Sequence, residues 1–528
     1  LPNGTFTGTV IVTVSGGSGA RARTNDTTKK NVPVSVSLVT PVTPSAPQTP
    51  PDNALIIPSV GHLGGLNSQW QSDIRVTNTS AEPLRYQLTF SQAGSSETKQ
   101  TEIEVGPNAT TALDDIVQNW YGLGSLSDGA NGILEVRPIG GHGGEDTPSA
   151  ASRVTVVSSR TYNATANGTL GQYIPAIPFS SFVGRANADG LQQVLSLQQI
   201  AQNSAYRTNV GLVEASGHAA SVNLSVFSPS GSKLLDLPIE LAAGEQKQMN
   251  ALLAANGIND LKDGRIEVRV TGGDGRVTAY ASVVDSQTND PLLVTGVPIG
   301  LAGASRFVLP GVAALNSGSA NWRTDMRVFN AGSGAQNATL TFFPQNDGPA
   351  RTADVTLNPG EVRTLDNVLQ SVFGVDNDGG TVHVTTGNNS ALVVTGRTYN
   401  QTPSGTFGQF VPAVTAADAV GSGERSLHIQ QVEDSPRYRT NLGLAEVNGR
   451  EAKVEVSVIL PDSRLTPKIE LTLPANSFRQ LPLLRELGLG NVYNARIVVK
   501  VLEGDGRIAA YGSIIDMNTQ DPTYVPAQ

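Results

Sequence analysis

Two short acidic segments contain the side chains best suited to bind a metal ion. The first reads D-x-x-T-x-D-P from Asp285, and the second repeats that pattern from Asp516. Calcium accepts carboxylate oxygens of this kind, and the candidate ligands are Asp285, Asp290, Asp516 and Asp521. The spacing is not that of an EF-hand, and such residues more often fold a turn through local hydrogen bonds. We therefore interpret both segments as turns that need no cofactor, with calcium as the alternative.

The other residues that catalysis commonly uses form no recognisable site. The five histidines have no metal-ligand spacing and do not recur between related segments, so we expect surface or loop positions for His62, His142, His218, His383 and His428. The stretches GGDGRV and EGDGRI lie between alternating strands, which indicates hairpin turns rather than phosphate-binding loops. The acidic residues are thinly scattered, which disfavours a paired-carboxylate hydrolase. The sequence thus favours a protein that is not an enzyme.

Composition excludes further classes of function. The 528 residues carry a net charge of −9 without a basic block, so nucleic-acid binding is not expected. The chain has no cysteine, which rules out disulfides and thiolate metal sites. No apolar run reaches the roughly 18 residues of a membrane span. The chain begins with Leu1 and has no signal-peptide pattern, so we expect a mature product whose targeting signal has been removed.

The second half of the sequence copies the first. Residues 206–217 read YRTNVGLVEASG and residues 438–449 read YRTNLGLAEVNG, with eight of the twelve positions identical. Residues 273–291 recur in the same way at 504–522. Internal repetition of this kind indicates a repeated structural unit.

Each half contains two related modules that begin with a common motif. An aromatic residue starts a strand, and Asp or Asn follows three positions later. We expect the ring to pack inward and the polar residues to hold the neighbouring loop. The motif residues are Trp70 and Asp73 in the first copy, Tyr206, Arg207 and Asn209 in the second, Trp322 and Asp325 in the third, and Tyr438, Arg439 and Asn441 in the fourth.

The periodicity within each module predicts an all-β fold. Short alternating strands are separated by Asp-Gly, Asn-Gly and Gly-Gly turns, and one helix-like patch closed by glycine lies midway. We predict four tandem immunoglobulin-like β-sandwich modules, each with one short helix, although a jelly roll or small barrel would fit the same pattern. The predicted boundaries are 54–178, 179–300, 301–415 and 416–528.

Residues 1–40 stand outside the four modules and predict a strand pair. They are followed at 41–53 by a proline-rich linker. The sequence of this segment, LPNGTFTGTVIVTV…NVPVSVSLVTP, resembles the last two strands of bacterial immunoglobulin-like repeats. Two interpretations follow: the strands are the end of an incomplete upstream domain, or they complete a sheet in another subunit by strand addition.

The modules themselves resemble the tandem immunoglobulin-like repeats of secreted bacterial surface proteins, adhesins and filament subunits. That resemblance implies a non-catalytic extracellular or cell-surface protein with a structural or adhesive role. We expect a rod of modules that self-associates, polymerises through its N-terminal strands, or binds a cell-surface or matrix partner. The alternative is a carbohydrate- or protein-binding array of a larger secreted enzyme, which exposed rings at Trp70, Trp120 and Trp322 would favour.

Asn-x-Ser/Thr triplets raise the possibility of attached glycans. In a chain this rich in Asn, Ser and Thr, many triplets arise by chance, so unmodified turn asparagines are the plainer interpretation. The candidate acceptors are Asn78, Asn108, Asn163, Asn167, Asn223, Asn337 and Asn400.

Overall fold

The computed structural model describes residues 10–14, 34–38, 49–65, 68–95, 98–125, 127–141, 154–166, 168–185, 193–299, 303–318, 320–346 and 348–528. Across these residues the fold is all-β, and the strand pairs are antiparallel. The predicted all-β class, with several β-sandwich-like domains, is confirmed. No helix among these residues is long and apolar enough to cross a membrane.

The strands after residue 54 form four successive groups, named here units 1 to 4. Unit 1 contains β3 (Leu55–Gly65), β4 (Ser68–Asn78), β5 (Leu84–Gln92), β6 (Thr98–Val105), β7 (Thr110–Leu113), α1 (Ile116–Asn119), β8 (Ala130–Gly141), β9 (Thr155–Thr165), β10 (Gly168–Pro175) and β11 (Ile177–Pro178), followed by the short 3-10 helix η1 (Phe179–Ser181). Unit 2 contains β12 (Val194–Gln202), β13 (Tyr206–Glu214), β14 (Ala220–Phe227), β15 (Lys233–Leu241), β16 (Gln246–Met249), α3 (Leu252–Ala255), β17 (Leu261–Gly273), β18 (Val277–Asp285), β19 (Pro291–Thr295) and β20 (Val297–Ile299).

The second half of the chain repeats this order of elements. Unit 3 contains β21 (Ala304–Ser317), β22 (Ala320–Asn330), β23 (Gln336–Pro344), β24 (Arg351–Leu357), β25 (Val362–Leu365), α4 (Val368–Phe373), β26 (Asp378–Ser390), β27 (Leu392–Thr402) and β28 (Gly405–Pro412). Unit 4 contains β29 (Leu427–Asp434), β30 (Tyr438–Glu446), β31 (Ala452–Ile459), β32 (Ile469–Leu473), β33 (Phe478–Leu481), α5 (Leu483–Glu486), β34 (Val492–Gly504), β35 (Ile508–Asp516) and β36 (Pro522–Pro526).

Two facing sheets make up each unit. In unit 2 the strand orders are β15-β14-β17-β12-β20 and β16-β13-β18-β19, and unit 4 follows the same neighbours. In units 1 and 3 the two sheets are joined because the first and second strands also pair as a hairpin. Immunoglobulin sandwiches place the first strand beside the second in an A-B-E-D sheet. In unit 2 the first strand, β12, instead lies beside β17, so the strand order differs from the immunoglobulin order.

Alternating side chains fill the space between the two sheets. In unit 2, Val222, Leu224 and Val226 of β14 point inward and are fully buried against apolar residues of β13 and β18. Their polar neighbours in β14 point to the other face, as the period of a strand requires. This is the alternation that predicts half-buried strands from the sequence.

The short helix of each unit lies where the sequence places it, between the fifth and sixth strands. A glycine with positive φ follows each of these helices: Gly122, Gly257, Gly374 and Gly488. Only a residue without Cβ adopts that backbone conformation at little cost, so glycine ends the helix and redirects the chain. The prediction of a glycine-closed helical patch is confirmed.

At the N-terminus, β1 (Val10–Val14) pairs antiparallel with β2 (Val34–Leu38) in a two-stranded sheet. Val12 lies opposite Val36 in this pair. The strand pair expected from residues 4–14 and 31–39 is therefore present in the part of it that the structure describes. The rest of residues 1–48 lies outside the described residues.

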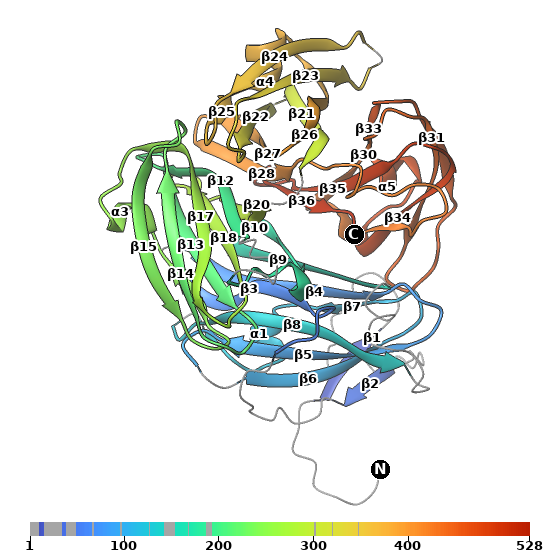
Figure 1. Cartoon of the computed structure of the whole chain (residues 1–528). Coiled ribbons are helices and arrows are strands. Elements are labelled where there is room, and N and C mark those ends of the chain that lie inside the picture. The colour runs from blue at the N-terminus through green and yellow to red at the C-terminus, as the bar shows by residue number, and fades with distance from the viewer. Residues whose placement is uncertain are drawn as a thin grey trace, which may run out of the picture.

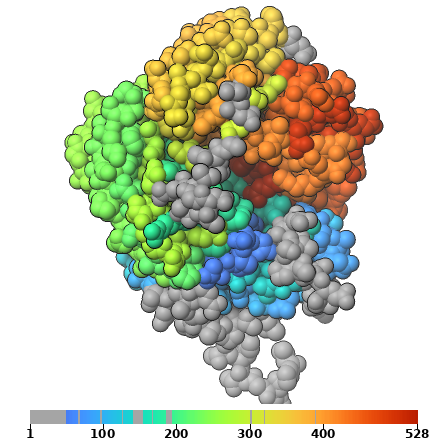
Figure 2. Space-filling view, in the orientation of Figure 1, coloured from blue at the N-terminus to red at the C-terminus, as the bar shows by residue number. Residues whose placement is uncertain are grey.

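The four units form a closed ring rather than a rod (Figure 1). Unit 4 returns to unit 1, where Nε of Arg75 donates to Oδ1 of Asn494 at 2.8 Å and Nη2 of Arg496 donates to the carbonyl of Asn108 at 2.8 Å. The space-filling view shows the units packed around a common centre (Figure 2). The prediction of a rod is wrong because the fourth unit contacts the first, so the series of units closes on itself.

The contacts around the ring alternate in character. One continuous apolar cluster joins unit 1 to Val213, Tyr280 and Leu293 of unit 2. A second cluster joins unit 3 to unit 4 residues that include Phe478 and Tyr511. The contacts between units 2 and 3, and between units 4 and 1, combine hydrogen bonds with smaller apolar groups. The ring therefore consists of two halves, units 1 and 2 and units 3 and 4, each with a shared core.

Candidate functional site

The two D-x-x-T-x-D-P segments lie at the centre of the ring, in the turns β18–β19 and β35–β36. Oδ1 of Asp285 accepts hydrogen bonds from the backbone N–H groups of Gln287 and Thr288 at 2.9 and 3.1 Å. Asp516 makes the equivalent bonds with Asn518 and Thr519. The interpretation of these segments as turns is confirmed, because each first aspartate folds its own loop.

The second oxygen of each first aspartate reaches the opposite half of the molecule. Oδ2 of Asp285 accepts from the N–H and the hydroxyl of Thr406 in unit 3, at 2.9 and 2.7 Å. Oδ2 of Asp516 does the same with Thr169 of unit 1, at 2.9 and 3.0 Å. Burial alone would raise the pKa of Asp285 and of Asp516, but these hydrogen bonds outweigh it and hold both values below normal.

A glycine in the opposing hairpin permits this close approach. Gly405 has φ +117°, and a Cβ there would lie 3.0 Å from Oδ1 of Asp285. Gly168 has φ +140°, and a Cβ there would lie 2.9 Å from Oδ1 of Asp516. Any larger residue would push the two halves apart at this point.

The second aspartates, Asp290 and Asp521, meet each other. Their side chains are 2% and 1% exposed, and Oδ2 of each accepts a backbone N–H from the opposite half: Gly408 at 2.7 Å and Gly171 at 2.8 Å. The two carboxyl groups also act on each other electrostatically, and Oδ1 of each is buried with no hydrogen-bond partner among the described residues. Asp521 thus joins units 4 and 1 through Gly171, and Asp290 joins units 2 and 3 through Gly408.

This aspartate pair holds its proton more tightly than an ordinary carboxyl group. Burial raises the pKa of Asp290 to about 7. Burial, and then the neighbouring charge of Asp290, raises the pKa of Asp521 well above its usual range. Two carboxylates in contact away from water cannot both be ionised without a large cost. The pair therefore acts as one acid that carries a shared proton.

Two buried arginines complete the junction. Arg397 donates to the hydroxyl of Tyr206 at 3.0 Å and to Oγ1 of Thr406 at 2.6 Å. Arg160 makes the matching bonds to Tyr438, at 3.3 Å, and to Thr169. Each guanidinium also lies over the ring of that tyrosine, 5.3 Å from its centroid. The motif tyrosines therefore pack inward against their own unit, as predicted, and also bind the neighbouring unit.

The other motif residues hold local structure. Asp73, Asn209 and Asp325 each accept the backbone N–H of the residue before the helix of their unit, at 2.8–2.9 Å. In unit 4 that residue is Pro482, which has no N–H for Asn441 to accept. In the first three units this polar position therefore contacts the loop before the helix.

The motif arginines and tryptophans differ from copy to copy. Arg207 reaches Oδ1 of Asn289 in the β18–β19 turn at 3.2 Å, whereas Nε of the half-buried Arg439 has no partner among the described residues. Trp70, Trp120 and Trp322 are all half-buried. None of these rings forms a flat exposed platform.

The calcium alternative lacks a suitable set of ligands. Three of the four oxygens of Asp285 and Asp290 already accept N–H or O–H groups, and the fourth, Oδ1 of Asp290, is buried without a hydrogen-bond partner among the described residues. Arg397 and Arg160 supply the local positive charge. Within the described residues, no group of three or more His, Cys, Asp or Glu side chains gathers as a metal site.

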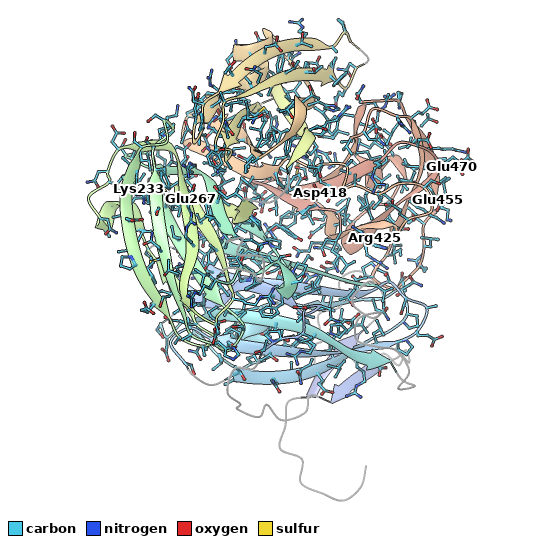
Figure 3. All side chains as sticks on the ribbon, viewed as in Figure 1. Lys233, Glu267, Asp418, Arg425, Glu455 and Glu470 are labelled. Atoms are coloured by element: carbon cyan, nitrogen blue, oxygen red, sulfur yellow. The ribbon has the colours of Figure 1, made fainter. Side chains whose placement is uncertain are left out.

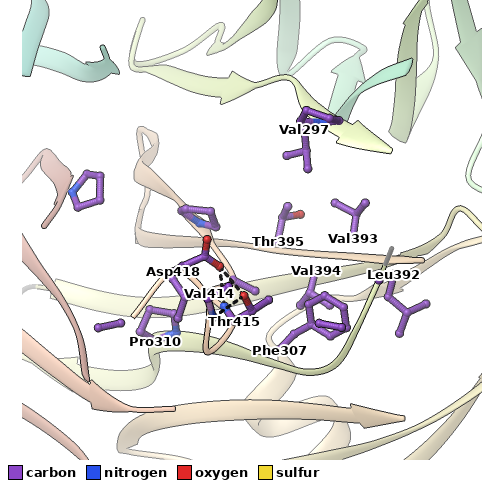
Figure 4. A pocket seen from close by; sticks show the side chains of 18 of the residues that line it. Val297, Phe307, Pro310, Leu392, Val393, Val394, Thr395, Val414, Thr415 and Asp418 are labelled. Atoms are coloured by element: carbon purple, nitrogen blue, oxygen red, sulfur yellow. Dashed lines mark hydrogen bonds between the residues drawn. The ribbon is translucent and has the colours of Figure 1, made fainter. Parts of the chain in front are cut away.

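Two cavities lie around the junction. The smaller, about 170 Å³, is on the ring axis and is lined by corresponding residues of β10, β19, β28 and β36, among them Tyr173, Leu293, Phe410 and Tyr524. The larger, about 590 Å³, lies between units 2, 3 and 4 and is mostly apolar (Figure 4). Its carboxylate, Asp418, accepts the N–H and hydroxyl of Thr415, both at 2.8 Å. This carboxylate thus folds a loop.

The expected surface positions of the histidines are partly wrong. His62 and His383 lie buried in strands, and His428 is half-buried. Burial and then Arg306 lower the pKa of His383 to about 3, and burial and then Arg496 lower that of His428 to about 3. Each imidazole therefore accepts a hydrogen bond from its arginine as a neutral group. His218 is exposed as predicted, and His142 lies outside the described residues.

The candidate glycan acceptors are also divided by burial. Asn78, Asn163 and Asn400 are buried at 0–2% exposure and hydrogen-bonded, so they cannot carry a glycan in the folded molecule. Asn223 is half-buried and bonded to Asp236. Asn108 and Asn337 are exposed, and Asn167 lies outside the described residues.

Comparison of the sequence with models of known protein families gives no match, and comparison with curated proteins gives none either. The junction residues therefore have to be judged on their own geometry. Sequence reasoning singled out both acidic segments and both tyrosines, but not their meeting at one point. The available indication was that the S/G-R-T-Y-N and D-x-x-T-x-D-P patterns are duplicated together, each once per half.

Proposed function

We propose that this chain is a non-catalytic extracellular or cell-surface protein with a structural or adhesive role, and that its four units act as one rigid ring-shaped scaffold. The proposal rests on the contacts made by the repeated acidic segments and by the motif tyrosines. Their carboxylates and hydroxyls bind the neighbouring unit, as Asp285 binds Thr406 and Asp516 binds Thr169. Polar groups that hold the units together in this way support a scaffold.

The charged outer surface supports the same role. Lys453 pairs with Glu470 at 2.6 Å and Lys468 with Glu455 at 2.9 Å across neighbouring strands of unit 4. Figure 3 shows Glu455 and Glu470 on the outer side of that unit, and Lys233 on the outer side of unit 2. Charged residues on outer strands keep a sheet edge from pairing at random. The ring is thus suited to stay separate until a specific partner binds.

For that partner we propose a second copy or a cell-surface or matrix component. β6, β15, β24 and β32 end their sheets among the described strands, so each can receive an added strand. β1 and β2 are a source of such strands, because an isolated two-stranded sheet is only marginally stable in water. We therefore propose polymerisation by strand addition from residues 1–40.

A proline substitution in the full chain tests this polymerisation. Val12→Pro removes a backbone donor from the middle of β1, whereas Val12→Thr keeps the donor and the branched side chain. Sedimentation velocity and electron microscopy across a concentration series should show association for the native chain and Val12→Thr, and its loss for Val12→Pro. Equal behaviour of the two variants, or a native chain that stays monomeric throughout, would contradict strand addition.

The adhesive role needs a separate binding test. Fluorescently labelled native chain should bind intact cell surfaces or matrix preparations saturably, and unlabelled chain should compete. The alternative role, as a carbohydrate-binding array, predicts binding to defined glycans through exposed rings. Of the large exposed apolar side chains among the described residues, only Tyr493 is aromatic, which favours the structural role. Failure to bind cells, matrix, glycans or itself would overturn the proposal.

A further inference from the structure

The junctions between the two halves of the ring are equivalent. Nε2 of Gln199 donates to Oγ1 of Thr395 at 3.0 Å between units 2 and 3. Nε2 of Gln431 donates to Oγ of Ser158 at 3.0 Å between units 4 and 1. Each half therefore contributes the donor at one junction and the acceptor at the other.

Further contacts repeat this equivalence. Nε of Arg327 donates to Oδ1 of Asp263 at 2.8 Å across one junction, and Nε of Arg75 donates to Oδ1 of Asn494 at 2.8 Å across the other. The aspartate–threonine and arginine–tyrosine contacts described above complete both sets. The surface of one half is thus complementary to the other half at two points, although the arginine meets a carboxylate at one and a neutral amide at the other.

Each half is cohesive in itself. The apolar cluster of unit 1 continues into unit 2 through Tyr280, and that of unit 3 continues into unit 4 through Tyr511. Between the halves the apolar contacts are smaller, such as the group around Phe329, Val362 and Val393 with Val297. The chain connects the halves once, between Ile299 at the end of β20 and Ala304 at the start of β21. No disulfide holds them, since the chain has no cysteine.

We propose that the contact surface between the halves is a self-association surface, and that its second partner is the opposite half of another copy of this chain. In the exchanged dimer, units 1 and 2 of one copy bind units 3 and 4 of the other, and every junction contact is retained. Exchange of identical parts through a short connection is a low-cost route to dimers. This surface is separate from residues 1–40, and the inference stands whether or not those residues add a strand elsewhere.

The equilibrium between the closed single ring and the exchanged dimer depends on protein concentration. Within one copy, the short connection gives each half an effective concentration in the millimolar range for its own partner. The closed single ring therefore dominates in dilute solution. Copies that fold side by side at high local concentration can exchange halves, and the retained junction contacts then keep them joined.

Cysteine pairs split between two copies test the exchange, because the native chain has no competing thiol. One tagged full-length copy carries Ser158→Cys, and a second copy with a different tag carries Gln431→Cys. The two are co-expressed, purified through both tags and treated with a short bismaleimide crosslinker. Exchange predicts a crosslinked species of twice the chain mass, recovered through both tags.

A matched pair within one half provides the control. Nδ2 of Asn131 donates to Oε1 of Gln246 at 3.0 Å between units 1 and 2, a contact that exchange leaves inside each copy. Copies carrying Asn131→Cys and Gln246→Cys separately should therefore give no crosslink between copies. Placing Val12→Pro in both copies separates exchange from strand addition and should leave the first crosslink unchanged.

Each possible crosslinking result either supports or overturns the inference. Crosslinking of the 158/431 pair without the 131/246 pair supports the exchanged dimer. Equal crosslinking of both pairs would mean general aggregation and would overturn the inference. Absence of the 158/431 crosslink between copies, while one copy carrying both substitutions crosslinks internally, would show that the halves bind only within a chain and would overturn it as well.

Discussion

At the scale of single residues, the molecule is organised around two kinds of aspartate. Asp285 and Asp516 are ionised and fully hydrogen-bonded, which lowers their pKa values. Asp290 and Asp521 are buried in contact, which raises theirs. Four residues separate the two kinds in each segment. Their roles are therefore set by their surroundings and not by residue type.

The proton held by the Asp290–Asp521 pair makes the free energy of unfolding depend on pH. An aspartate has a pKa of about 3.9 in the unfolded chain, and that of Asp290 is raised to about 7 in the folded protein. Between these values the folded state binds more protons, so stability is complete below the lower value and is lost as pH rises through the upper one. Each unit of raised pKa corresponds to about 1.4 kcal/mol. The melting temperature of the native chain should decrease as the pH is raised from about 4 to about 8.

Asp290→Asn should flatten this pH profile. The introduced amide donates to Asp521 without a shared proton, and its oxygen can still accept from Gly408. Asp274→Asn, in an exposed turn, serves as the control and should leave the native profile unchanged. Parallel profiles for the native chain and Asp290→Asn would show that the aspartate pair carries no linked proton.

Calcium should not stabilise the molecule, because three of the four aspartate oxygens in each segment already accept hydrogen bonds and an arginine charge acts on each segment. Thermal unfolding at neutral pH in millimolar calcium should match unfolding in chelator. A rise of several degrees that depends on Asp290 or Asp521 would revive the metal interpretation.

The hydroxyl of Thr406 serves both Asp285 and Arg397. Thr406→Val keeps the shape of the side chain and removes that donor and acceptor, which should cost about 1–3 kcal/mol because charged partners stay buried. Thr271→Val, on an exposed strand, should cost much less. Denaturant unfolding measures both variants, and equal losses would contradict the assigned role of Thr406.

At the scale of elements, one polar position supports the helix of each unit except the last. Asn209 accepts the N–H of Ala251, while Asn441 faces the segment that begins with Pro482. The same substitution should therefore have different effects. Asn209→Ala should cost about 1 kcal/mol, and Asn441→Ala should cost little. Comparison of their denaturation midpoints tests this, and a larger loss at Asn441 would refute it.

At the scale of the whole molecule, alternating apolar and polar junctions build a ring from two cohesive halves. Size scaling for a compact chain of this length gives a radius of gyration of about 24 Å. Four units arranged end to end would give roughly twice that value. Small-angle X-ray scattering of dilute protein should therefore give a value near the compact one, slightly enlarged by residues 1–48. A value near that of a rod would contradict ring closure.

The sequence by itself determined the local structure. Alternation in segments such as Ala220–Phe227 predicts half-buried strands, glycines such as Gly374 mark helix ends, and the duplicated motifs predict repeated units. These features depend on neighbours within a few residues, so they can be read along the chain. Asp285 could likewise be predicted to fold its own turn, because the bonded N–H groups lie two and three residues away.

Only the tertiary structure determined which residues contact each other across the ring. Asp290 and Asp521 are far apart in the sequence, and their contact depends on the rotation between successive units, which no local pattern encodes. The same rotation decided ring over rod, whereas the packing of strands within each unit decided the strand order and the burial of His383 and Asn78. The motif fixes which polar groups each unit offers. The angle at which rigid units meet determines which groups they reach, and that angle is a property of packed surfaces rather than of any single segment.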